Sequence, residues 1–277
     1  MKLDKVHLVF FSPTRTSRKI GEAIVRGTGL KCIEMSDLTG KPAIGQEFGA
    51  DTLVVVACPV YGGHIPPLAL SRMEGLHASG TPAVAVVVYG NRAYEHALQE
   101  LDSLLAAKGF RVIAAGTFIG EHSYSTERHP IAAGRPDAKD LEEAALLGRR
   151  VMEKLRKAGG ADMAGRVDVS RIRKPRQPFF HLLRFIYKVT RMRKSGQPMP
   201  STPAVDADLC THCGHCAAVC PNEAIAKGDE CHTRADRCIR CCACVKGCPQ
   251  KARSFDTPFA GLLSENFRYR KANEVIL

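Results

Sequence analysis

Cysteines are concentrated near the end of the chain, where ten of the twelve fall between Cys210 and Cys248. Eight of them form two runs of identical spacing, C-x2-C-x2-C-x3-C-P. In this spacing three thiolates hold one [4Fe–4S] cluster and the fourth reaches the other cluster of a pair. The runs therefore predict two clusters with crossed ligands. The expected ligands are Cys210, Cys213, Cys216 and Cys248 for one cluster, and Cys238, Cys241, Cys244 and Cys220 for the other.

Structural zinc is the main alternative for such a segment. It needs four ligands, typically two C-x2-C pairs, and explains neither the third cysteine of each run nor the prolines that follow, Pro221 and Pro249. Disulfides are disfavoured for a chain expected in a reducing compartment. Cys231 and Cys242 are left over, and we expect Cys242 to pack beside a cluster as a small side chain. The neighbouring histidines are expected to support the site or lie at the surface, not to bind iron. They are His212, His215 and His232.

Length and charge divide the chain into parts. With 277 residues, it has room for a second domain beside the cysteine-rich one. Residues 1–165 carry a net charge of +2, residues 166–200 a net +9, and residues 201–277 a net +1. We therefore expect an α/β domain over 1–165 and a basic linker over 166–202. A small α+β cluster-binding domain follows over 203–257, with a C-terminal tail over 258–277.

Strand-like and helix-like runs alternate through residues 5–160, which is typical of a parallel sheet covered by helices. The expected strands are Val6–Phe11, Lys31–Met35, Thr52–Ala57, Pro82–Tyr89 and Phe110–Ile119. The expected helices are Thr16–Arg26, Pro67–His77, Tyr94–Lys108 and Asp137–Lys157. Five parallel strands of this length match a doubly wound fold, which binds its ligand at the carboxyl ends of the strands.

Three loops at that edge carry groups suited to a flat, phosphorylated ligand. The first has hydroxyls beside a helix N-terminus, which forms an anion site; the second pairs glycines with a tyrosine, and the third combines tyrosines with a glycine. Any one of them is also explained as a helix cap or a turn, but together they predict a flavin. The residues are Ser12, Thr14, Arg15, Thr16 and Ser17; Pro59, Val60, Tyr61, Gly62 and Gly63; and Tyr89, Gly90, Asn91 and Tyr94. Neither G-x-x-x-x-G-K-[ST] nor G-x-G-x-x-G occurs, so nucleoside triphosphates and dinucleotides lack their usual motifs.

These stretches resemble the flavodoxin–ferredoxin fusion proteins, also called 4Fe-4S flavodoxins. The resemblance covers most of the chain except the basic linker. It rests on Pro59–Gly63, Tyr89–Arg92, Glu121–Ser125, Gly134–Asp137 and the cysteine runs. It implies a flavodoxin-like five-stranded domain whose first loop holds the phosphate of flavin mononucleotide (FMN), joined to a two-cluster ferredoxin-like domain. Arg15 departs from the family pattern, because a glycine often stands at that position.

Two further segments leave alternatives open. Residues 121–136, with His122, Ser123, Tyr124 and His129, form either a lid over the flavin or a polar loop that ends where Asp137 caps a helix. In residues 179–194 an amphipathic pattern places Leu182, Ile186 and Val189 on one face and cations on another. Such a helix packs between the domains, or it contacts an anionic membrane or an acidic partner.

The sequence predicts an electron carrier. No apolar run is long enough for a membrane span and no secretory signal is visible at the N-terminus, so a cytoplasmic protein is expected. Clusters exchange single electrons and a flavin one or two, so the chain is expected to pass electrons between FMN, the clusters and redox proteins. A flavin-dependent reductase of a small molecule and a ferredoxin with a flavin-free docking domain remain alternatives. No nucleic-acid-reading motif accompanies the basic charge.

Overall fold

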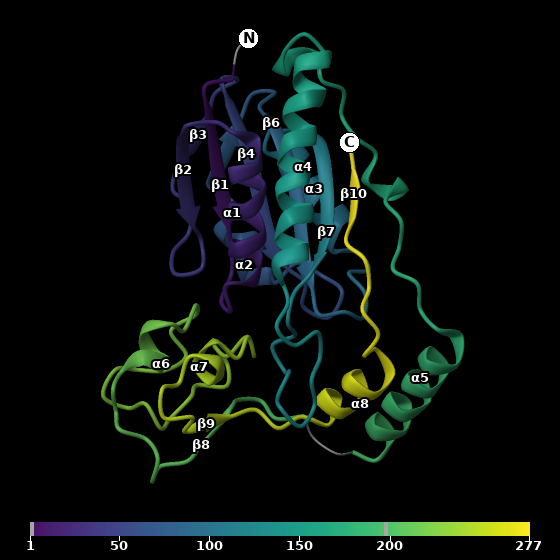
Figure 1. The fold of residues 1–277 in the computed structure, drawn as a ribbon. Coiled ribbons are helices and arrows are strands. Elements are labelled where there is room, and N and C mark those ends of the chain that lie inside the picture. The colour runs from purple at the N-terminus through teal and green to yellow at the C-terminus, as the bar shows by residue number, and fades with distance from the viewer. Residues whose placement is uncertain (1–2, 197–198) are drawn as a thin grey trace.

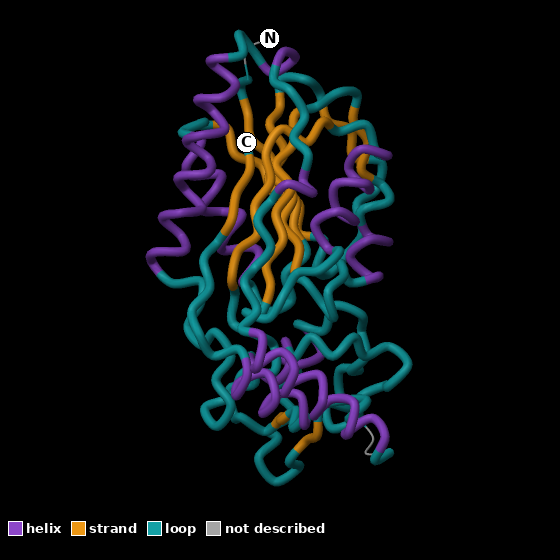
Figure 2. Tube along the Cα trace, turned by 90° about the vertical axis from the view of Figure 1, so that its right-hand side faces the viewer, coloured by secondary structure: helices purple, strands orange, loops and turns teal. Residues whose placement is uncertain are grey.

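The computed structural model describes residues 3–196 and 199–277 (Figure 1). Met1 and Lys2 at the N-terminus lie outside the described residues, as do Gln197 and Pro198 of the expected linker. A layered α/β domain forms one end of the molecule. The segment 203–257, called here the cysteine-rich module, lies at the carboxyl ends of the parallel strands of this domain (Figure 2).

The main sheet has six strands in the order β10-β7-β6-β4-β1-β2. The strands β1 (Lys5–Phe10), β2 (Cys32–Asp37), β4 (Thr52–Pro59), β6 (Pro82–Tyr89) and β7 (Arg111–Ile119) run parallel. Their order confirms the expected flavodoxin-like doubly wound sheet. Every residue of β4 and β6 is buried, because helices cover both faces of the sheet. The register brings the carboxyl ends of these two strands and β1 side by side, with Phe10 opposite Ala57 and Pro59 opposite Val88.

Two apolar cores lie on the two faces of the sheet. On one face, α1 (Thr16–Thr28) and α4 (Ala138–Lys157) pack together over the strands. Gly27 and Gly148 allow this close packing, since a Cβ at either would collide with backbone of the other helix. On the other face lie α2 (Pro67–Arg72) and α3 (Ala97–Ala107). The cap predicted at Asp137 is present, because its carboxylate accepts from the backbone N–H of Asp140.

The expected helix over Pro67–His77 ends early, at Arg72. Leu76–Ala78 instead forms strand β5, which pairs in parallel with β3 (Gln46–Phe48). Gly75 lies so close to the carbonyl of Ala43 that a Cβ there would stand 2.2 Å from that oxygen. Segment 43–48 packs against residues 75–78. These residues therefore form an extended strand in place of the last turn of the expected helix.

The last residues of the chain, which we expected to form a tail, return to the main sheet. After α8 (Pro258–Asn266), strand β10 (Glu274–Ile276) pairs antiparallel with β7. Asn273 accepts a hydrogen bond from the Ile119 backbone N–H at 2.9 Å, just before β10 begins. The sheet therefore has a sixth, antiparallel edge strand that the sequence analysis did not predict.

The basic linker contains one short 3-10 turn, η2 (Val169–Arg171), and helix α5 (Phe179–Lys194). A further 3-10 turn, η1 (Ala161–Met163), precedes the linker. One face of α5 packs on α8 through Leu182, Phe185 and Val189. The predicted face was wrong in one member, since Ile186 is 50% exposed and Phe185 takes the buried place. The helical pattern there was ambiguous, because both residues are large and apolar.

The cysteine-rich module has little regular structure. Its elements are β8 (Ala204–Val205), α6 (His215–Ala218), α7 (Ala243–Lys246) and β9 (Arg253–Ser254), with β8 and β9 paired antiparallel. Each short helix carries the third cysteine of its run, Cys216 in α6 and Cys244 in α7. The repeat in the sequence is thus a repeat in structure.

Candidate redox centres

Two pockets in the module collect the eight cysteines of the runs. The first pocket contains Cys210, Cys213, Cys216 and Cys248, and the second contains Cys220, Cys238, Cys241 and Cys244. Each pocket thus takes three cysteines from one run and the fourth from the other. Four thiols around a small pocket form a donor set suited to a [4Fe–4S] cluster.

The chain geometry explains the exchange of the fourth cysteine. Cys220 and Cys248 each follow the short helix of their run, and the proline after each cysteine continues the chain away from that helix. The carbonyl of Cys220 accepts from the N–H of Glu223, which has a positive φ of 51°, so the chain turns sharply there. Both fourth cysteines thereby line the pocket of the other run.

The two pockets differ in burial. In the second, Cys241 and Cys244 are 7% and 8% exposed, and burial raises the pKa of their thiols to about 12 and about 11. In the first, Cys216 is equally buried but Cys213 is exposed. The second pocket is therefore the inner one.

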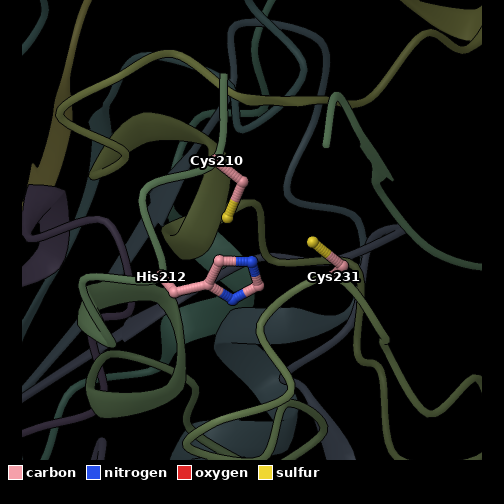
Figure 3. Close-up of side chains that lie close together, drawn as sticks. All are labelled: Cys210, His212 and Cys231. Carbon is pink, nitrogen blue, oxygen red and sulfur yellow. The ribbon is translucent and has the colours of Figure 1, made fainter. Parts of the chain in front are cut away.

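The two cysteines outside the runs take different places. Cys242 is 2% exposed and lies in the wall of the second pocket, as a small buried side chain. Cys231 does not line the first pocket, but it lies close to Cys210, which does, and to His212; Figure 3 shows the three side chains facing one another. Their ligand atoms lie within 4.8 Å of one another. His212 also contacts the buried carboxylate of Glu230, with 3.1 Å between Nδ1 and Oε2. Both histidine and thiol are therefore neighbours of an expected ligand.

The first loop of the α/β domain leads directly into helix α1. Arg15, where flavodoxins often have glycine, adopts the left-handed conformation with φ 65° and immediately precedes α1. Arg15, the residue before α1, makes no side-chain capping hydrogen bond. The Ser12 hydroxyl accepts from the N–H of Arg18 in the first turn, whereas the buried Ser17 hydroxyl has no partner among the described residues. A helix N-terminus beside an orphaned hydroxyl fits a bound phosphate group.

The second loop faces the cysteine-rich module. Tyr61 N–H donates to His64 carbonyl, and Gly62 between them has a positive φ with open space where a Cβ would stand. The hydroxyl of Tyr61 is buried beside Cys241 and Cys242, and burial raises its pKa well above the usual range. The other predicted residues here, Pro59 and Val60, continue from the end of β4. This loop therefore joins the expected flavin edge to the second pocket.

The third loop turns its side chains inward. Tyr89 and Tyr94 are 2% and 1% exposed, and their rings pack together in the core at 5.6 Å between centroids. The Asn91 amide donates to the backbone carbonyls of Phe267 and Tyr269. Gly90 packs against His122, whose ring would collide with a Cβ there. Tyr89 and Tyr94 therefore lie in the core and Asn91 contacts the C-terminal segment, and their expected contact with a cofactor stays a prediction.

Side chains far apart in sequence hold the module against the α/β domain. Arg72 donates to the carbonyl of Pro221, next to Cys220, and to the carbonyl of Leu38 at 2.8 Å. On the other side, Lys246 of α7 donates to the Ser125 carbonyl at 2.8 Å and forms an ion pair with Glu121. Segment 121–136, expected as a lid or a polar loop, thus contacts the module.

Sequence analysis missed one charged residue between the pockets. Arg253 is 4% exposed, lies in the wall of the first pocket and donates to the Glu230 carbonyl at 2.9 Å. Its positive charge also reaches Cys238 and Cys244 of the second pocket, lowering the pKa of both thiols against the larger effect of burial. Its Nε has no partner among the described residues. The sequence around Arg253 is typical of a surface segment. The burial of its side chain could therefore be found only from the structure.

Comparison with known proteins found one family model and a set of similar solved structures. Residues 202–225, which contain the first run, match a family model described as a 4Fe-4S binding domain. No curated protein matches the chain. Solved structures similar to it include a flavodoxin from the domain Archaea, with 14% identity and a TM-score of 0.36 over 55% of this chain and 99% of that one. A Streptococcus pneumoniae TIGR4 flavodoxin has 17% identity and a TM-score of 0.36 over 53% and 99%.

A flavodiiron protein from Giardia intestinalis is also similar, with 18% identity and a TM-score of 0.36 over 59% of this chain and 38% of that one. The strand order and the matched segment together define the class. The chain combines a flavodoxin-like domain with a ferredoxin-type 4Fe-4S binding segment, as the resemblance in its sequence implied.

Proposed function

We propose that this protein is an electron-transfer iron–sulfur flavoprotein that binds FMN and two [4Fe–4S] clusters and exchanges electrons with other redox proteins. The observation that carries the proposal is the position of the second pocket. Cys241 and Cys242 lie beside Tyr61, at the edge of the sheet where a flavodoxin-like fold binds its ligand. A flavin at that edge and a cluster in that pocket would be neighbours.

The residues of the chain have separable tasks in this proposal. When bound, the flavin supplies one- or two-electron chemistry and the clusters supply one-electron chemistry. The N-terminus of α1 and the Ser17 hydroxyl would hold the phosphate. The eight cysteines would hold the irons, and Arg72 and Lys246 fix the module over the second loop.

A carrier is favoured over a small-molecule reductase by the covering of the second loop. Tyr61 is half-buried, with Ser123, Tyr124, Cys241 and Cys242 near its hydroxyl, whereas Gly62 beside it is exposed. A reductase needs an open site beside the flavin ring for its substrate, and these side chains narrow the approach past Tyr61.

Anaerobic purification with iron, sulfide and flavin quantitation tests the proposal. We expect two clusters and one FMN per chain, and reduction of the clusters when the flavin is photoreduced. Thr14→Glu should abolish flavin binding and leave the cluster absorbance intact, because its carboxylate repels the phosphate. Thr14→Ser is the matched control and should retain the flavin. A wild-type protein that binds no FMN, even when FMN is added, would refute the proposal.

A further inference from the structure

Helix α5 has a second apolar face that no part of the described chain covers. The inner face of α5 is covered by protein, because Phe185 packs on Phe267 of the C-terminal segment with 5.0 Å between ring centroids. Five other large apolar side chains nevertheless remain exposed on the same helix. They are Phe179 (65% exposed), Phe180 (81%), Leu183 (48%), Ile186 (50%) and Tyr187 (64%).

These five side chains, named here the outer stripe, form a continuous surface. Successive residues of a helix turn by about 100°, so the outer stripe covers a sector of about 120° over its first turns. Three of the five are aromatic. Contiguous exposed apolar surface of this kind marks a binding surface more often than a solvated one.

Positive charge surrounds the outer stripe. Residues 166–200 contain ten Lys and Arg residues against one acidic residue, Asp168. Arg184 and Lys188 lie along one flank and share Glu265 of α8. Arg191, Arg193 and Lys194 follow in the last turn, and the described residues offer no ion-pair partner to any of the three. The surface therefore combines aromatic side chains with unneutralised cations.

We propose that the outer stripe docks the protein onto an anionic lipid surface. An amphipathic helix lying in the plane of a bilayer places aromatic and aliphatic side chains at the boundary between headgroups and acyl chains, and its cations near the lipid phosphates. Among the described residues no helix is long and apolar enough to cross a membrane, so contact would be peripheral. This inference does not depend on which cofactors the protein carries.

The charge distinguishes this occupant from the others. A second copy of the chain would bring two segments of net charge +9 together, which is repulsive at close range. An acidic protein would pair with the cations but would not account for the five exposed apolar side chains of the outer stripe. An anionic bilayer satisfies both parts of the surface at once.

A single-tryptophan probe tests the proposal, because the chain contains no tryptophan. Phe180→Trp places the probe in the outer stripe, and Ile44→Trp, at a position that is 88% exposed on the α/β domain, is the matched control. With vesicles of phosphatidylcholine and phosphatidylserine at low salt, emission from position 180 should shift to shorter wavelength and return at high salt. Emission from position 44 should not move. Vesicles of phosphatidylcholine alone should give much less shift.

A triple variant then links the stripe to binding. Phe180→Ser with Leu183→Ser and Tyr187→Ser should weaken co-sedimentation with the anionic vesicles by about tenfold or more. Met163→Ser, at another exposed apolar position, should change nothing. Unchanged far-ultraviolet circular dichroism checks that the variants fold. Absent binding, or equal binding to neutral vesicles, overturns the proposal; so does a concentration-dependent dimer that the triple variant abolishes.

Discussion

The two cysteine pockets share one ligand spacing and differ in their surroundings. The second is walled by buried Cys241 and Cys244 and is held against the α/β domain through Pro221 and Lys246. The first lies farther from that domain. Its ligand Cys213 is exposed, and Cys231, which belongs to neither run, lies beside its ligand Cys210. A repeated motif therefore produces two unequal sites, because docking to the α/β domain buries only one side of the module.

This inequality suggests a direction for electrons. With the proposed cofactors bound, the second pocket would exchange electrons with the flavin and the first with outside partners. The experiments below test whether the pockets are crossed, unequal and separately tuned.

Loss of one cluster is the largest effect we expect. Cys220→Ser should remove an iron from, or change the potential of, the cluster in the second pocket, although Cys220 belongs to the first run. Cys248→Ser should disturb the cluster in the first pocket. Serine is a harder ligand and deprotonates less readily than cysteine. Electron paramagnetic resonance of anaerobically reduced protein should show a different cluster perturbed in each variant. Damage to the cluster of the mutated run itself would contradict the crossed arrangement.

Unequal exposure should appear as unequal rates of iron loss. Because Cys213 is exposed and Cys241 and Cys244 are buried, an iron chelator should strip the first pocket several-fold faster than the second. The signals assigned with the serine variants identify which cluster disappears, in a time course without oxygen. Equal rates, or faster loss from the second pocket, would show that burial in the folded state does not control access.

Acid should destabilise the folded protein through His122, which lies in the segment that contacts the module. Burial, with smaller effects of Lys246 and Arg92, lowers the pKa of His122 to about 4 from 6.5. Between these two pH values His122 is protonated in the unfolded chain but neutral in the folded chain. The free energy of unfolding therefore falls as pH drops from about 6.5 to about 4. The loss is at most about 3 kcal/mol.

His122→Gln removes the titrating group and should flatten this part of the stability profile. The measurement is the difference in denaturation midpoint between variant and wild type at each pH, which cancels the acid lability of the clusters common to both. A difference that stays constant across this range would mean that His122 is protonated without cost in the folded protein.

The smallest effect concerns the charge between the pockets. Arg253→Met removes a buried cation that lies in the wall of the first pocket and reaches thiols of the second. Loss of positive charge disfavours added electrons, so both cluster potentials should become more negative without loss of either cluster, the first more than the second. Potentiometric titration measures the shifts. Arg234→Met, at an exposed position, is the control; an equal shift there would exclude a local effect of Arg253.

Local patterns predicted much of this molecule. The cysteine spacing indicated two crossed ligand sets, and the strand-like runs indicated the parallel sheet, because both depend on neighbours in sequence. The inequality of the pockets could not be predicted, since it depends on contacts such as that of Arg72 with Pro221, 149 positions apart. Tyr89 and Tyr94 were assigned to the ligand because an aromatic residue at a strand end suits either a cofactor or the core, and only packing distinguishes the two.

Strand β10 has a consequence for the kinetics of the whole molecule. The chain leaves the sheet through the linker, forms the cysteine-rich module, and returns through α8 to pair with β7 (Figure 1). The module is therefore tethered at both of its ends to the domain it faces. Two tethers keep the effective local concentration of one redox partner near the other high and constant. Any transfer between them would be first-order, independent of how dilute the protein is, and only the exchange with outside partners would depend on concentration.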